Sequence, residues 1–166
     1  MARGLFITRK DIVRRTPLGG NVDTDKYFNM AYEVQEIQLQ GILGTQLYRK
    51  LETDVINSTL TGNYLTLVNT YIKDFVCWYT LAELVPFLSF SIVNGGVVQH
   101  EPENGTSASF DEVLSLEARA KNKAEHHGRR MYDYLCANNS LFPEWNQYQS
   151  GDMSKQGDST KVSWVL

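Results

Sequence analysis

Apolar side chains recur at helical spacing between Lys26 and Leu51, with polar residues on the opposite side. The inward face should consist of Tyr27, Met30, Ala31, Val34, Ile37 and Gly41, and the outward face of Lys26, Asn29, Glu33, Glu36 and Gln40. Asp23 can accept a hydrogen bond from the free amides that open this helix. Gly44 suits a left-handed C-cap and Thr45 can cap the next turn, Gln46 to Glu52. The pattern therefore predicts two helices joined by a hinge.

A shorter helix is predicted before this one, from Asp11 to Thr16. Pro17 and the Gly19-Gly20-Asn21 cluster are typical of a turn and should end it.

The most apolar segment is Phe75 to Val93, which approaches the ~20 residues that span a bilayer. Against a membrane helix stand Glu83 in the middle, Pro86 shortly after it, and the lack of a Lys or Arg cluster at either end. We favour a core helix from Tyr64 onward that other helices surround. Pro86 should kink or end its regular part. Its narrow polar stripe is Thr66, Asn69, Thr70, Lys73, Asp74, Cys77 and Thr80.

After this helix the pattern becomes extended. Asn94-Gly95-Gly96 separates two short β-branched runs, which predicts a small hairpin or an ordered loop. The polar stretch Glu101 to Ser109 should be an exposed loop, either a solvated connector or a contact with a neighbouring subunit. Ser109 is then suited to cap the next helix.

A second long helix is predicted from Phe110 to about Ala137. Its apolar positions are Val113, Leu116, Ala120, Ala124, His127, Met131 and Tyr134. Its basic residues include Arg119, Lys121, Lys123, Arg129 and Arg130, mixed with acidic ones. Such mixing is typical of a solvated helix with i,i+4 pairing. The alternative is that Arg119, Lys123, Arg129 and Arg130 form an inter-subunit face or line a DNA conduit.

Composition fits one globular domain: 166 residues, 42% hydrophobic and 21% charged, are enough to bury roughly two thirds of the unfolded surface. The net charge of −3 argues against sequence-specific DNA binding. Cys77 and Cys136 have no metal-ligand spacing and should pack as small apolar side chains in a reducing compartment. The residues after Met1 do not show the basic region followed by a long apolar region that is typical of a secretory signal.

Catalytic chemistry has little support in the sequence. His126 and His127 are adjacent, so on a helix they diverge by about 100° and cannot share a metal as an i,i+4 pair can. His100 has no acidic motif around it, and no nucleophile elbow or phosphate-binding loop is present. A small cytoplasmic α-helical enzyme or metal protein would have to use these histidines and scattered carboxylates. We expect neither catalysis nor a cofactor.

The C-terminal segment is aromatic but poor in aliphatic residues, which is typical of an extended arm. Its last six residues have high β propensity and could add a strand to a partner. The predicted docking residues are Trp145, Tyr148, Lys161, Val162, Ser163, Trp164, Val165 and Leu166. The alternative is a strand folded back on the arm's own domain.

Part of the chain carries a resemblance to a known family, and the matching residues are DIV at 11–13, GGNVD at 19–23, and the run from Tyr27 through QEIQLQGILGTQLY. These residues resemble head-to-tail adaptor proteins of tailed phages. The similarity is greatest to the portal-proximal ring proteins of crAss-like phages and covers about a quarter of the chain. It implies a virion protein at the head-tail junction, assembled in the host cytoplasm. Such a protein forms a homo-oligomeric ring, a dodecamer in this family, between the portal and the next neck or tail ring. It also implies an arm that reaches the portal.

The predicted fold is mainly α, a bundle of about four to five helices with a small β-hairpin and an extended C-terminal arm. Residues 1–140 would form the bundle, with a hairpin and loop insertion around 92–109, and 141–166 the arm. The predicted function is a non-enzymatic connector ring around a conduit for genomic DNA, whose acidic wall would not retain a passing polyanion. The alternatives are a neck stopper or other tail-proximal ring, the small enzyme, and a membrane-anchored accessory protein.

Overall fold

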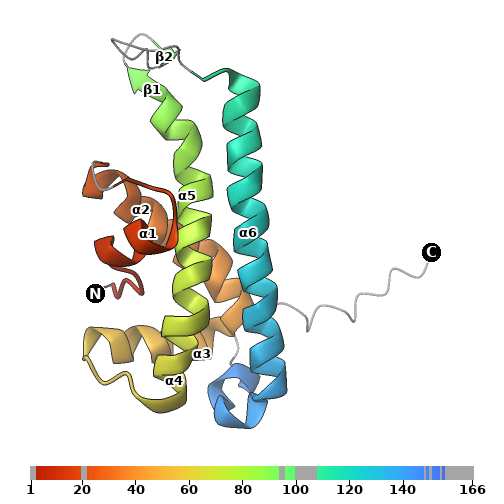
Figure 1. The fold of residues 1–166 in the computed structure, drawn as a ribbon. Coiled ribbons are helices and arrows are strands. Elements are labelled where there is room, and N and C mark those ends of the chain that lie inside the picture. Colours follow the sequence, from red (N-terminus) through yellow and green to blue (C-terminus); the bar gives the residue numbers. More distant parts are fainter. Residues whose placement is uncertain are drawn as a thin grey trace, which may run out of the picture.

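The chain is mainly helical in a computed structural model, as predicted (Figure 1). The structure describes residues 3–19, 22–93, 96–99, 108–147, 149, 151–153 and 155. Its α-helices are α1 (Arg9–Arg15), α2 (Thr24–Val34), α3 (Gln40–Ile56), α4 (Gly62–Leu67), α5 (Lys73–Ser89) and α6 (Phe110–Ala137). Its π-helices are η1 (Gln35–Leu39) and η2 (Val68–Ile72), and its 3-10 helices are η3 (Asn139–Leu141) and η4 (Pro143–Asn146).

Helices α5 and α6 run side by side along the length of the molecule, and α1 and α2 pack against α5 (Figure 1). The buried positions of α6 include Ala120, Ala124 and Gly128, whose small size permits close approach. The core lies along this helix pair and beneath α2 and α3. Among the described residues, no helix is long and apolar enough to cross a membrane.

The predicted caps of the long helices are confirmed. The Asp23 side chain accepts from the Asp25 amide and opens α2. Ser109 and Glu112 form a capping box at the start of α6, which begins at Phe110 as expected. Helix α1 begins at Arg9, earlier than predicted, because Thr8 and Asp11 form a second capping box.

The predicted apolar face of the Lys26–Leu51 segment is wrong beyond Val34. Ile37 is 66% exposed, whereas Gln35 and Leu39 are fully buried. The reason is η1, whose wider π turn adds a residue and rotates the following positions around the axis. The Gln35 amide is satisfied in the core because it accepts from Phe6 N at 2.8 Å and donates to Gly4 O at 3.0 Å.

The predicted hinge at Gly44 is present as a kink. Gly44 has φ 71° and ψ 160°, a backbone conformation that favours glycine, and the helix continues beyond it to Ile56. Thr45 does not cap the next turn as predicted. Its backbone amide donates to Met153 O, and its hydroxyl oxygen accepts from Met153 N, so it fastens a C-terminal segment onto α3.

Pro86 does not end α5, which continues to Ser89 and stops where Phe90 becomes extended. The polar stripe predicted along this helix is covered over part of its length. Cys77 and Thr80 are fully buried, and α1 places charged groups against Lys73 and Asp74. Strands β1 (Phe90–Val93) and β2 (Gly96–Gln99) follow and pair antiparallel.

Residues 94–95, which would turn the predicted hairpin, lie outside the described residues, so the hairpin as a unit stays a prediction. Most of the predicted loop, 101–107, lies outside them as well.

The predicted boundary of the arm at residue 141 is wrong. Phe142 is fully buried and Trp145 is 4% exposed, because η3 and η4 fold back and η4 packs against α3. The Tyr64 hydroxyl of α4 also donates to Glu144 at 2.7 Å. Trp145 is therefore a core residue rather than an exposed docking residue. Tyr148 and residues 161–166, the rest of the predicted docking set, lie outside the described residues.

Candidate functional site

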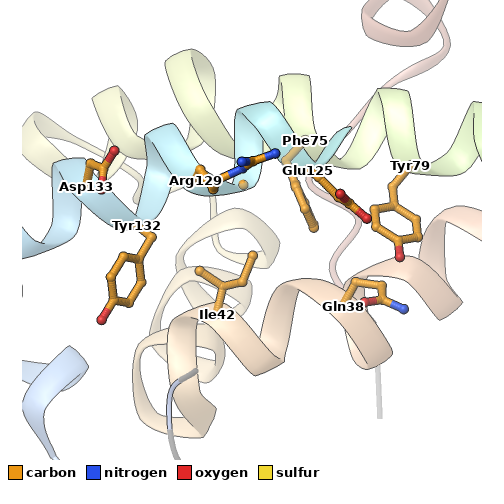
Figure 2. Close-up of a pocket in the computed structure, with 9 residues that line it drawn as sticks. Gln38, Ile42, Phe75, Tyr79, Glu125, Arg129, Tyr132 and Asp133 are labelled. Atoms are coloured by element: carbon orange, nitrogen blue, oxygen red, sulfur yellow. The ribbon is translucent and has the colours of Figure 1, made fainter. Parts of the chain in front are cut away.

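A cleft of about 500 Å³ lies between the η1–α3 junction and the α5–α6 pair (Figure 2). Its floor is apolar and consists of Ile42, Phe75 and Gly128. Tyr79 and Tyr132 line it as aromatic walls. Four polar residues complete the lining, and they are Gln38, Glu125, Arg129 and Asp133.

Helix α6 supplies the charged rim because Glu125, Arg129 and Asp133 follow one another at i,i+4 spacing. All three are exposed, and within the described part of the chain none forms an ion pair. Gly128 lies between Glu125 and Arg129 in the sequence, and its lack of a side chain lets α6 approach the Phe75 ring of α5 closely. A Cβ atom there would lie 3.0 Å from Cε2 of Phe75.

The opposite wall depends on the π turn of η1, which carries Gln38. Figure 2 shows the side chains of Gln38 and Tyr79 facing one another across the cleft. Ile42 is held from behind, because its carbonyl oxygen accepts from Nε1 of Trp145 at 3.2 Å. The Trp145 ring also meets the Tyr132 ring edge to face. The sequence pattern missed this wall because a regular 3.6-residue period points Ile37 inward instead.

Burial raises the pKa of Tyr79, and the carboxylates of Glu83 and Glu125 add to the rise, so the phenol remains a neutral donor. A floor of apolar and aromatic side chains beside two carboxylates and one guanidinium can hold an aromatic or aliphatic group next to a cation.

The four residues of the predicted inter-subunit face do not all lie on the same side of α6. At about 100° per residue, Arg119, Lys123 and Arg130 share one side of α6, whereas Arg129 points to another. Lys123 Nζ lies 4.2 Å from the Trp78 ring centre and Arg130 lies 5.9 Å from that of Tyr71. These two cations cover aromatic rings of neighbouring helices, and only Arg129 belongs to the cleft. Arg119 is exposed.

A cluster of charged groups joins α1 and α5, and the sequence pattern did not predict it. Arg15 donates to Asp74, and Lys73 Nζ lies 3.2 Å from Oδ2 of Asp11. Burial opposes ionisation of Asp11, but hydrogen bonds from Thr8 and Lys73 outweigh it and hold its pKa below the usual 3.8. These pairs are half-buried, which is typical of a structural network that fixes α1 on α5.

The histidines and cysteines form no metal site in the part of the chain that the structure describes. His127 Nδ1 lies 4.0 Å from Oδ2 of Asp74, and burial lowers its pKa. Burial raises the pKa of Cys77 to about 12, so this thiol is a packing group, as predicted. Cys136 is exposed, which corrects the prediction that it packs. His100 lies outside the described residues.

The fold and cleft define a mainly helical chain with a cleft of mixed polar and apolar lining. The chain belongs to the family of unknown function DUF6712, which it matches over residues 39–154. The matched region includes the cleft except Gln38, together with the C-terminal residues that fold onto α3. Comparisons with curated proteins and with solved structures give no match.

Proposed function

We propose that this chain is a structural virion protein that forms an oligomeric ring and connects a phage portal to the neck or tail. The resemblance of about a quarter of the chain, near its N-terminus, to head-to-tail adaptors suggests this role. The corresponding residues build α1, α2, η1 and the first part of α3. The ring would enclose the path of the genomic DNA.

The observation that carries the assembly part of this proposal is a group of exposed apolar side chains at one end of the α5–α6 pair. Phe87 is 52% exposed at the end of α5, and Phe110 is 60% exposed at the start of α6. Leu114 follows one turn later, and the Phe90 and Phe110 rings lie 6.1 Å apart. Large exposed apolar groups that gather at one place are typical of protein interfaces. Subunit contacts at this end would remove them from water.

Native mass spectrometry of the full-length chain, with and without its cognate portal, tests the proposal. We expect a ring-sized oligomer bound to the portal. The double variant Phe87→Ser, Phe110→Ser should lose the oligomer, whereas Ile37→Ser, which changes an exposed apolar residue on η1, should keep it. Charge reversal at Arg129 and Arg130, two residues of the predicted inter-subunit face of α6, should also block assembly. A monomer that ignores the portal in every form would overturn the proposal.

The same experiment separates two positions in the neck. An adaptor binds the portal directly, whereas a stopper requires an intermediate ring. The predicted arm residues other than Trp145 would supply the portal contact or a contact with a neighbouring copy.

A further inference from the structure

The cleft places aromatic side chains next to charged groups that have no ion-pair partner among the described residues. Phe75 and Tyr79 form the floor and one wall, and the carboxylates of Glu125 and Asp133 stand beside them without ion pairs within the described residues. The rim carries two carboxylates and one guanidinium, so its formal charge is negative. An aromatic side chain accompanied by a cation is the complementary ligand.

The chain itself contains a segment with this chemistry. Residues 161–166 read Lys-Val-Ser-Trp-Val-Leu, with one cation, no acidic side chain, and an indole between small and aliphatic residues. Trp is the aromatic side chain with the largest apolar area and the strongest attraction for a guanidinium. Trp164 matches the aromatic lining and Arg129, and Lys161 matches the two carboxylates.

The structure fixes the point from which this segment starts. The Met153 backbone amide donates a hydrogen bond to the Thr45 hydroxyl oxygen, and the Gln46 side-chain amide donates one to the Asp152 carboxylate. Lys155 Nζ lies 3.9 Å from the Trp145 ring centre. These contacts hold residue 155 next to the Gly44 kink, two residues along α3 from Ile42 in the cleft floor. Eleven residues, 156–166, follow and can span about 35 Å when extended. This length is enough to reach the cleft of a neighbouring molecule, which is the contact that would join two copies.

We propose that residues 161–166 of one copy bind in the cleft of a second copy, with Trp164 on the Phe75–Gly128 floor and Lys161 beside Glu125 and Asp133. This inference rests on the proposed function, because it names a contact that would join successive subunits of the ring.

A binding measurement with separated parts tests the contact. The chain truncated after Lys155 keeps the bonds to Thr45 and Gln46, and it is titrated with an acetylated and amidated peptide of residues 156–166. Calorimetry should show saturable binding at one site. Peptides with Trp164→Ala or Lys161→Glu should bind at least tenfold more weakly. Absence of binding by the unaltered peptide would overturn the proposal.

Matched protein variants locate the site. Glu125→Lys should weaken the peptide at least tenfold, whereas Glu33→Lys, an exposed acidic residue on α2, should not change binding. Likewise Arg129→Ala should weaken it and Arg130→Ala should not. Equal effects of both members of either pair would show that the peptide binds elsewhere.

A crosslinking experiment decides whether the contact joins two copies. Full-length chains carrying Trp164→benzoylphenylalanine are prepared with natural and with heavy nitrogen, mixed and irradiated. Crosslinks between a light residue 164 and a heavy cleft peptide are expected. Crosslinks within single chains alone would place the segment in its own cleft and overturn the proposal. The peptide and crosslinking experiments contain no portal, so their results do not depend on portal binding. If the peptide binds here and the chain fails to bind the portal in native mass spectrometry, the proposed function is rejected and this contact is kept.

Discussion

Thr45 and Met153 exchange two hydrogen bonds: the Thr45 amide donates to Met153 O at 3.2 Å, and the Met153 amide donates to the Thr45 hydroxyl oxygen at 2.9 Å. The Gly44 kink makes this exchange possible, because it frees backbone groups that a continuous helix would use internally. The kink therefore binds the C-terminal segment in addition to joining two helical parts of α3.

Thr45→Val should release this segment, because valine keeps the shape of threonine and removes the acceptor. We expect the free energy of unfolding to fall by about 1 kcal/mol. Amide hydrogen exchange at residues 151–153 should become faster. Thr53→Val is the matched control, since its exposed hydroxyl donates to the Arg49 carbonyl on the same helix. Unchanged exchange in Thr45→Val would show that other contacts hold the segment.

Gln35→Leu should destabilise the chain more strongly. The buried Gln35 side chain satisfies the Phe6 amide and the Gly4 carbonyl, and leucine would leave both without a partner. The cost should be about 2–4 kcal/mol, measured by urea unfolding. Gln38→Leu, close by on the half-buried face of η1, should change stability by less than about 1 kcal/mol. Similar losses in both variants would contradict the role assigned to Gln35.

Two glycines in helices should respond to alanine with opposite signs. At Gly128 the new Cβ would lie 3.0 Å from Phe75, so Gly128→Ala should lower the free energy of unfolding by about 1–3 kcal/mol. At Gly41 nothing lies within 4 Å, so Gly41→Ala should raise it by about 0.5–1 kcal/mol. Chemical denaturation of both variants under one condition gives the comparison. A stabilised Gly128→Ala would mean that α6 can move away from α5 at little cost.

The elements were predictable where local chemistry fixes them. Asp23 and Ser109 cap their helices by short-range hydrogen bonds, and Gly44 has a backbone conformation that favours glycine. These three positions could therefore be predicted from the sequence. The predicted connector function and its partners remain proposals, since family membership states no function.

The cleft could not be predicted, because its geometry depends on η1. A π turn has no strong local sequence signature. Its extra residue leaves Ile37 exposed and buries Gln35 and Leu39 instead. Trp145 was misplaced for a related reason. Its burial results from contact with Ile42, far away in the sequence, whereas its local surroundings are polar and turn-rich.

Stability should depend on pH through His127. Burial lowers its folded-state pKa below the ordinary 6.5, despite the opposing attraction of Asp74, so the unfolded chain binds this proton more strongly. Its contribution to stability is then complete above pH 6.5 and is lost as the pH falls toward the folded-state pKa. Urea unfolding at pH 7.5 and 5.5 should show a smaller decrease for His127→Gln than for the unaltered chain. His126→Gln, which changes an exposed neighbour, should keep the original decrease. An identical pH dependence in His127→Gln would assign the loss to other groups.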